Sequence, residues 1–119
     1  MKKIISVLVI LLLCACSSNN YKTIDATDAY EMIKNENDVV ILDVRNRDEF
    51  MESHILNSIN IPLAEIEQIT LDKDSKIIVY CLSGVRSLEA SKKLVSMGYT
   101  SVYNIDGGLI NWGYELVSE

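Results

Sequence analysis

The sequence predicts an α/β domain in which a mostly parallel central sheet is flanked by helices, giving a three-layer sandwich. Residues 39–42 and 77–80 are short, continuous apolar runs rich in β-branched side chains, as is typical of parallel strands buried on both faces. Segments with helical spacing separate the runs, so strands alternate with helices. A chain of 119 residues, 49% of them hydrophobic, has room for one such domain and its core.

The first half of the chain supplies one long helix and several short elements. Asp25 is a capping residue, and apolar side chains recur at helical spacing behind it, which predicts a helix over residues 26–35. The elements expected after the 39–42 strand are a helical turn over residues 47–52, a short strand over 58–61 that Pro62 ends, and a helix over 63–69.

The second half of the chain contains the most hydrophobic strand, residues 77–80, with Cys81 directly behind it. Leu88, Leu94 and Val95 then recur at helical spacing, and Gly98 is placed to end that helix. Residues 101–104 are predicted to form an edge strand.

The amino terminus has the layout of a secretory signal. Two lysines precede an apolar stretch over residues 4–13, which is shorter than the roughly 20 residues that a membrane-spanning helix needs. Residues 13–16, Leu-Cys-Ala-Cys, resemble the lipobox of bacterial lipoproteins, which implies cleavage before Cys16 and attachment of a lipid to its sulfur. An ordinary secretion signal is the alternative.

These features predict how the chain is divided and where it resides. We expect residues 1–15 to be a lipoprotein signal peptide, 16–22 a flexible tether that carries lipidated Cys16, and 23–119 the folded domain. The protein is then extracytoplasmic and lipid-anchored to a membrane of the bacterial cell envelope.

The charge balance argues against a nucleic-acid partner. The chain has 11 basic and 17 acidic residues and a formal net charge of −6. Binding to a phosphate backbone requires a basic surface, so we expect no nucleic acid among the partners.

Cys81 is the candidate nucleophile. Cleavage and lipidation would remove Cys14 and Cys16 as thiols, which leaves Cys81 as the one free thiol. It follows a buried strand, at the edge where parallel sheets place their ligand sites. The loop that leads from it into the next helix consists of Leu82, Ser83, Gly84, Val85 and Arg86.

That loop can favour a thiolate. Backbone N–H groups of the loop and of the first helical turn can converge on the sulfur, and Gly84 lets the chain turn with a positive φ. A helix N-terminus and the guanidinium of Arg86 both lower the pKa of a nearby thiol. The alternative is a buried, inert cysteine beside an arginine that only solvates the helix.

The segment over residues 81–87, Cys-Leu-Ser-Gly-Val-Arg-Ser, resembles the active-site loop of rhodanese-like sulfurtransferases. The flanking segments that resemble the family's other signatures are residues 41–45, 49–50, 54–55 and 58–62, and, toward the carboxyl end, 106–108 with Trp112. Their order and spacing fit the family over residues 22–116. One departure is Asn57, which stands where the family usually has glycine.

The resemblance implies a rhodanese fold and a double-displacement reaction. Cys81 would take the outer sulfur of a donor such as thiosulfate, hold it as a persulfide, and pass it to a thiophilic acceptor such as a thiol or cyanide. Amides of the loop and the Arg86 side chain would stabilise the anion, and no cofactor is implied. Leu82 stands where thiosulfate-using relatives commonly carry a charge, which weakens the case for thiosulfate, so the donor stays open between a thiosulfate-like compound and a persulfide.

Two other functions compete with sulfur transfer. Phosphatases and arsenate reductases of a related type place five residues between cysteine and arginine, whereas this loop has four, which suits a smaller cradle. A non-catalytic rhodanese-like module that binds a partner or senses sulfur or redox state is the second alternative. Such modules usually lack the cysteine, so the presence of Cys81 favours catalysis.

Three further polar residues have supporting roles in this interpretation. Asp43 and Arg45 follow a strand and are expected to form ion pairs that steady the loops, with a direct contact to substrate as the alternative. His54, the only histidine, is expected to be structural. One histidine and one free cysteine do not make a usual metal-ligand set, so no metal site is expected.

Overall fold

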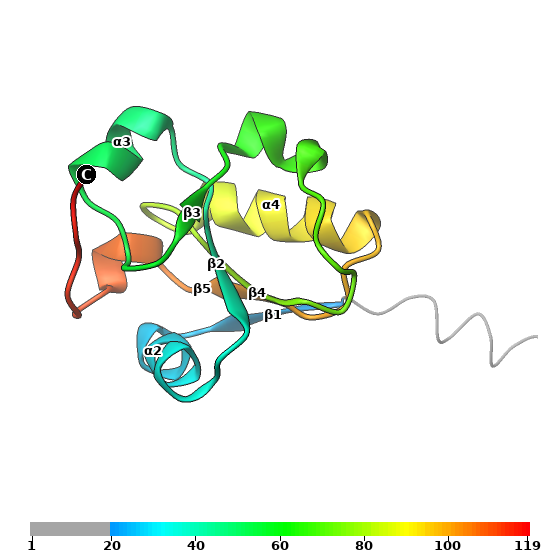
Figure 1. Ribbon diagram of the computed structural model, residues 1–119, viewed down its shortest axis with the longest axis horizontal. Helices are drawn as coiled ribbons and strands as arrows, with labels where there is room; N and C mark the ends of the chain where they lie inside the picture. The colour runs from blue at the N-terminus through cyan, green and yellow to red at the C-terminus, as the bar shows by residue number, and fades with distance from the viewer. Residues whose placement is uncertain (1–19) are drawn as a thin grey trace, which may run out of the picture.

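The computed structural model describes residues 20–119 as a three-layer α/β sandwich, as predicted (Figure 1). Its five strands form one parallel sheet in the order β1-β5-β4-β2-β3. The strands are β1 (Tyr21–Ile24), β2 (Val39–Asp43), β3 (Ile59–Asn60), β4 (Lys76–Tyr80) and β5 (Val102–Ile105). The α-helices are α2 (Ala26–Asn35), α3 (Arg47–Glu52) and α4 (Val85–Ser96), and the 3₁₀ helices are η1 (Leu63–Gln68) and η2 (Gly108–Asn111).

Successive side chains of the central strand β4 enter two separate cores. Ile77 and Val79 pack with α4 and η1 on one face, and Cys81 continues this series. Ile78 and Tyr80 pack with α2 and the carboxyl-terminal segment on the other face. Figure 1 shows α4 and α2 on opposite sides of the sheet. The continuous apolar run of β4 is therefore explained by burial on both faces.

The predicted helix over residues 26–35 is confirmed as α2, and its cap is the expected one. The Asp25 side chain accepts a hydrogen bond from the backbone N–H of Asp28 at 2.8 Å. The turn over residues 47–52 is confirmed as α3. The 63–69 helix is a 3₁₀ helix that ends at Gln68.

The edge-strand prediction for residues 101–104 is wrong. β5 lies between β1 and β4, inside the sheet, and the edge beside it is formed by β1. β1 includes Tyr21 and Lys22, which the predicted tether over residues 16–22 contained, so the sheet begins earlier than expected. The remainder of the tether over 16–19, Cys16 included, and the predicted signal peptide over residues 1–15 lie outside the described residues.

Asn57, which stands where the family usually has glycine, adopts a backbone conformation that is typical of glycine. Its φ is 70°, the left-handed region that glycine enters freely and that asparagine tolerates better than most residues. Asn57 thus adopts, two residues before β3, a backbone conformation that glycine also enters.

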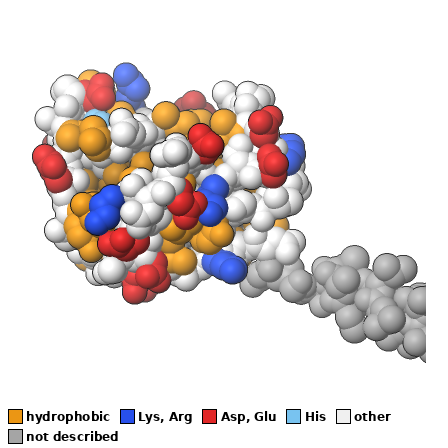
Figure 2. All heavy atoms as spheres, turned by 60° about the horizontal axis from the view of Figure 1, so that its bottom comes forward, with side chains coloured by type: hydrophobic (Ala, Val, Ile, Leu, Met, Phe, Trp, Pro, Cys, Tyr) orange, Lys and Arg blue, Asp and Glu red, His pale blue; other side chains and the backbone are white. Residues whose placement is uncertain are grey.

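The distribution of charged side chains and the lengths of the helices describe the outside of the domain. On the face that Figure 2 presents, acidic and basic side chains are interspersed among apolar ones. Within residues 20–119, every helix falls short of the length and hydropathy that crossing a bilayer would require.

Candidate active site

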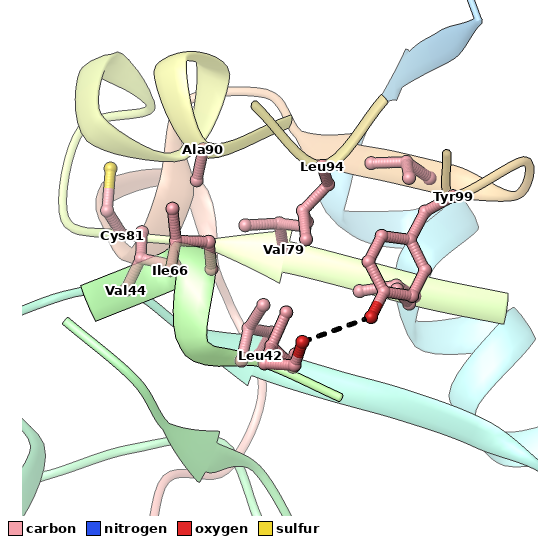
Figure 3. Close-up of a cluster of buried hydrophobic side chains, with 11 residues drawn as sticks. Leu42, Val44, Ile66, Val79, Cys81, Ala90, Leu94 and Tyr99 are labelled. Atoms are coloured by element: carbon pink, nitrogen blue, oxygen red, sulfur yellow. Dashed lines mark hydrogen bonds between the residues drawn. The ribbon is translucent and has the colours of Figure 1, made fainter. Parts of the chain in front are cut away.

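Cys81 lies directly behind β4, at the carboxyl edge of the sheet and under the first turn of α4. Its side chain is fully buried at the end of the core cluster that α4 covers. Figure 3 shows the sulfur directed toward α4, with Val44 and Ile66 beside it. A strand fixed by neighbours on both sides thus presents the thiol to a helix N-terminus, as the sequence predicted.

Backbone and side-chain groups of the loop converge on the sulfur. The N–H of Gly84 donates to Cys81 Sγ at 3.1 Å and that of Ser87 at 3.3 Å, while Ser87 Oγ lies 3.5 Å from Sγ. Burial opposes ionisation, but the hydrogen bonds from Ser87, Gly84 and Ser83 hold the pKa of the Cys81 thiol below its ordinary value. The loop is therefore built to favour a thiolate, and it can hold an anionic persulfide in the same way.

Gly84 makes this convergence possible. It is the residue that precedes α4, and its φ of 99° lies in the left-handed region. A Cβ at this position would approach the Gly107 nitrogen to 3.2 Å, so neither the conformation nor the space suits a larger residue. The turn aims the Gly84 N–H at the sulfur and starts the helix one residue later.

Arg86 is directed at a carboxylate rather than at the sulfur. Its Nη1 and Nη2 donate to Glu49 Oε1 and Oε2 at 2.8 and 3.1 Å, in a two-pronged ion pair between α4 and α3. The hydrogen bond that Arg86 donates to Glu49 is the largest cause that raises the pKa of Arg86, and the charge of Cys81 adds to it. Arg86 thus acts on the sulfur as a nearby charge. The remaining loop side chains, those of Leu82, Ser83 and Val85, are exposed.

Ser87 and Asn104 are site residues that the sequence analysis missed. Ser87 Oγ donates to Asn104 Oδ1 at 2.6 Å, and both side chains are buried. Asn104 lies on β5, which was expected at the edge of the sheet and lies inside it. A polar residue on an inner strand of an otherwise apolar sheet, beside the Cys81 loop, could have marked Asn104 as a site residue. Recognising that position requires the strand order, which the sequence alone does not supply.

Asp43 and Arg45 form the structural ion pair that was expected. Arg45 donates to Asp43 through Nε at 3.0 and 3.1 Å and through Nη2 at 2.7 Å, and it also donates to the Ser53 carbonyl. Asn60 Nδ2 donates to the carbonyls of Asp43 and Arg45 and so holds the chain after β2. The pair fixes the loops beside β4, and neither residue contacts Cys81 through a hydrogen bond.

The segment after β5 covers the Cys81 loop. The N–H groups of Leu109 and Ile110 donate to the carbonyls of Cys81 and Leu82, each at 3.0 Å. A Cβ on Gly108 would collide with the Cys81 carbonyl and lie 2.7 Å from that of Leu82, so only glycine permits this approach. The glycine pair that resembles the family's carboxyl-terminal signature is thus explained by close packing of η2 on the loop.

His54 has a structural environment. Its ring stacks on Phe50, its Nδ1 lies 2.7 Å from the Phe50 carbonyl, and its Nε2 lies 3.5 Å from a carboxylate oxygen of Glu119. Trp112 packs in the core below η2, edge to face with Tyr30. Within residues 20–119, side chains of His, Cys, Asp and Glu do not gather in groups of three that could hold a metal ion.

The chain resembles known proteins of one family. Residues 25–115 match the family described as the rhodanese-like domain. The chain is 35% identical over 94 residues to a thiosulfate sulfurtransferase, GlpE, of Coxiella burnetii, with 77% of this chain and 87% of the relative covered. It is 32% identical over 91 residues to a sulfurtransferase of Allochromatium vinosum, with 75% and 85% covered.

A solved structure agrees with these relatives. The crystal structure of a rhodanese-related protein from Thermoplasma volcanium is 38% identical, has a TM-score of 0.74, and covers 83% of this chain and 100% of its own. The family match spans β2, the Cys81 loop and η2, which are the elements that build the site. The chain therefore belongs to the rhodanese-like domain family.

Proposed function

We propose that the protein is a sulfurtransferase that carries a sulfane sulfur on Cys81 as a persulfide. The observation that supports this most directly is the cradle of donors at the sulfur, in which Gly84 and Ser87 hydrogen bonds lower the thiol pKa. A nucleophile whose anionic form is stabilised by backbone donors already in place is what covalent transfer of sulfur requires.

The reaction has two balanced halves. The Cys81 thiolate attacks the outer sulfur of the donor, a new S–S bond forms, and the donor's own bond to that sulfur breaks with its electron pair leaving on sulfite or on a thiolate. In the second half an acceptor thiolate or cyanide attacks the outer sulfur of the persulfide, and the electron pair returns to Cys81. The loop amides can stabilise the sulfur anion both as the thiolate and as the persulfide.

The substrates are a small sulfur donor and a thiophilic acceptor. The Coxiella relative is named for thiosulfate, which makes thiosulfate the first donor to test. A persulfide is the second, because Leu82 brings an apolar, exposed side chain to the loop rather than a charge. Since Cys81 is fully buried in this structure, the loop or η2 has to yield for the outer sulfur of either donor to reach Sγ.

The test is the mass of Cys81 before and after exposure to thiosulfate or to an organic persulfide. The tryptic peptide over residues 77–86 isolates Cys81 from Cys14 and Cys16. We expect a gain of one sulfur atom that cyanide removes with release of thiocyanate, and no gain in the Cys81→Ser variant. Absence of the adduct with both donors would refute transfer and leave the binding or sensing module.

We also propose that the chain is a lipoprotein held at the outside of a bacterial membrane. The proposal rests on the sequence over residues 1–16, which lies outside the described structure. Expression in a bacterial host with a labelled fatty acid tests it: label should enter the wild-type protein and the Cys14→Ser variant but not the Cys16→Ser variant. Release of an unlabelled, cleaved protein would show an ordinary secretion signal instead.

A further inference from the structure

A chain of hydrogen-bonding side chains leads from the buried thiol to the surface. Ser87 Oγ lies 3.5 Å from Cys81 Sγ and 2.6 Å from Asn104 Oδ1, and Asn104 Nδ2 lies 3.5 Å from Thr23 Oγ1. Ser87 is fully buried and Asn104 is 4% exposed, whereas Thr23 is exposed on the edge strand β1. The chain crosses four elements: the end of β4, α4, β5 and β1.

The hydroxyl of Ser87 has one proton and several acceptors. At 2.6 Å, Asn104 Oδ1 is the nearest of them, ahead of the Gly84 carbonyl at 3.2 Å and the sulfur at 3.5 Å. While that proton points at Asn104, the Cys81 thiol can donate to Ser87 Oγ but cannot receive from it. This arrangement suits the neutral thiol, and it leaves a thiolate with the backbone N–H donors of Gly84 and Ser87 but without the Ser87 hydroxyl.

We propose that Asn104 is a positioning residue that reverses the direction of this hydrogen-bond chain when Cys81 becomes an anion. In the thiol state Cys81 donates to Ser87, Ser87 to Asn104 Oδ1, and Asn104 Nδ2 to Thr23. In the anionic state the amide of Asn104 turns over, so that Thr23 donates to Oδ1, Nδ2 donates to Ser87 Oγ, and Ser87 donates to the sulfur.

The reversal conserves atoms and charge. The thiol proton leaves to solvent, the two hydroxyls rotate, and the amide turns, with no other bond made or broken. Asparagine suits the position because its side chain carries a donor and an acceptor on one planar group, so each orientation satisfies both neighbours. The positive end of the amide dipole then faces the anion, whether thiolate or persulfide. Its use in turnover rests on the proposed sulfur transfer, but the reversal itself is a property of the thiol.

Charged groups around the loop act on the same sulfur and stay unchanged in the test. Arg86 on α4 is paired with Glu49 on α3, and the Asp43–Arg45 pair lies at the end of β2. The charged side chains around the loop are Asp43, Arg45, Glu49 and Arg86, and Lys22 and Asp106 lie next along the chain to Thr23 and to the end of β5. Replacing Asn104 or Thr23 with an apolar residue alters none of them, so a change in thiol ionisation reports the hydrogen-bond chain.

The sign of one pKa shift decides the proposal. Asn104→Leu keeps the approximate volume and removes the amide. If the amide reverses, the variant loses a dipole that stabilises the anion, and the Cys81 pKa rises by about one unit, a tenfold loss of thiolate below the pKa. If Oδ1 faces Ser87 in both states, the variant loses an unfavourable dipole and the pKa falls. The rate of alkylation of the 77–86 peptide in the full chain, followed against pH, measures it.

A double-mutant cycle tests whether the effect passes through Ser87. The pKa rise caused by Asn104→Leu should disappear in the Ser87→Ala background, because the chain is already broken there. An equal rise in both backgrounds would overturn the proposal.

Thr23→Val provides a second variant on an exposed site, should Asn104→Leu fail to fold. It should raise the Cys81 pKa by a smaller amount, whereas Thr27→Val, an exposed threonine on α2, should leave it unchanged. No shift from Thr23→Val, or an equal shift from both, would count against the chain. Because alkylation requires no sulfur donor, these results stand whether or not persulfide transfer is found.

Discussion

Glu49 and Arg86 join α3 to the first turn of α4 through two hydrogen bonds of 2.8 and 3.1 Å. Glu49 is itself fixed, because its Oε1 also accepts from the backbone N–H of Asn46 in the capping box of α3. The one cation in the Cys81 loop is thus neutralised by a carboxylate that a helix cap holds in place. This arrangement makes the loop less attractive to a dianion than its sequence suggests.

Releasing Arg86 should therefore favour a more highly charged donor. Glu49→Gln keeps the side-chain shape and the Asn46 contact but removes the opposing charge. We expect the ratio of kcat/KM for thiosulfate, a dianion, to kcat/KM for an organic thiosulfonate, a monoanion, to rise about fivefold, the equivalent of ~1 kcal/mol. Glu52→Gln, an exposed residue on the same helix, makes the same change in net charge and should leave the ratio as it is. Equal effects from the two variants would show that overall charge, not the pairing of Arg86, sets the preference.

The same pair should contribute to stability over a defined pH range. The hydrogen bond from Arg86 is the main reason that the pKa of Glu49 falls from 4.5 to about 2. A depressed carboxyl pKa stabilises the folded state above the unfolded pKa, and this contribution is lost as the pH falls through the folded one. The difference in unfolding free energy between wild type and Glu49→Gln should thus be constant above about pH 5 and vanish near pH 2. Denaturant unfolding at several pH values measures it, and a difference independent of pH would contradict the assignment.

Breaking the buried pair between Asp43 and Arg45 should be costly. Asp43→Asn leaves the Arg45 guanidinium, which is 4% exposed, without a countercharge. We expect a loss of about 3 kcal/mol in the free energy of unfolding, in the range for a buried pair with one partner removed. Urea denaturation checks this, with Asp48→Asn on the exposed start of α3 as the control. A loss below about 1 kcal/mol would mean that water or another carboxylate reaches Arg45.

Gly108 should tolerate no side chain, in contrast to Gly113. Gly108→Ala places a methyl group against the carbonyls of Cys81 and Leu82 at a φ of 55°, so η2 has to move off the loop. We expect a destabilisation of about 2 kcal/mol and faster alkylation of Cys81. Gly113→Ala meets nothing within 4 Å and should change stability by less than about 0.5 kcal/mol. Similar melting temperatures for the two variants would refute the close packing of η2.

The sequence predicted most of the fold because the central strands are strongly apolar. The runs in β2 and β4 are buried on both faces, and alternation with helices then leaves few architectures. It did not predict β1, whose four residues lie at an edge and are partly exposed, so that no apolar run marks them. It misplaced β5 at the edge of the sheet, whereas β5 is an inner strand whose polar Asn104 is hydrogen-bonded internally to Ser87.

The parts of the candidate site that are close together in the sequence were predicted, and the contacts between distant segments were not. Cys81, Gly84 and the convergence of amides follow from a strand, a loop and a helix that are consecutive in sequence. The partners of Arg86 and Ser87 could not be found in that way, because Glu49 and Asn104 come from distant segments. Local sequence indicates what a loop can do, while long-range packing decides where its polar groups are directed.

The pairing of β1 with β5 affects the order in which the strands of the sheet can come together during synthesis. β1 is synthesised first, yet its one neighbour in the sheet is the strand that leaves the ribosome last. Until residues 102–105 emerge, β1 has nothing to pair with and the Ser87 hydroxyl lacks its Asn104 acceptor. The nascent chain therefore cannot complete its thiol environment step by step, and the reactive form of Cys81 arises only with closure of the whole sheet.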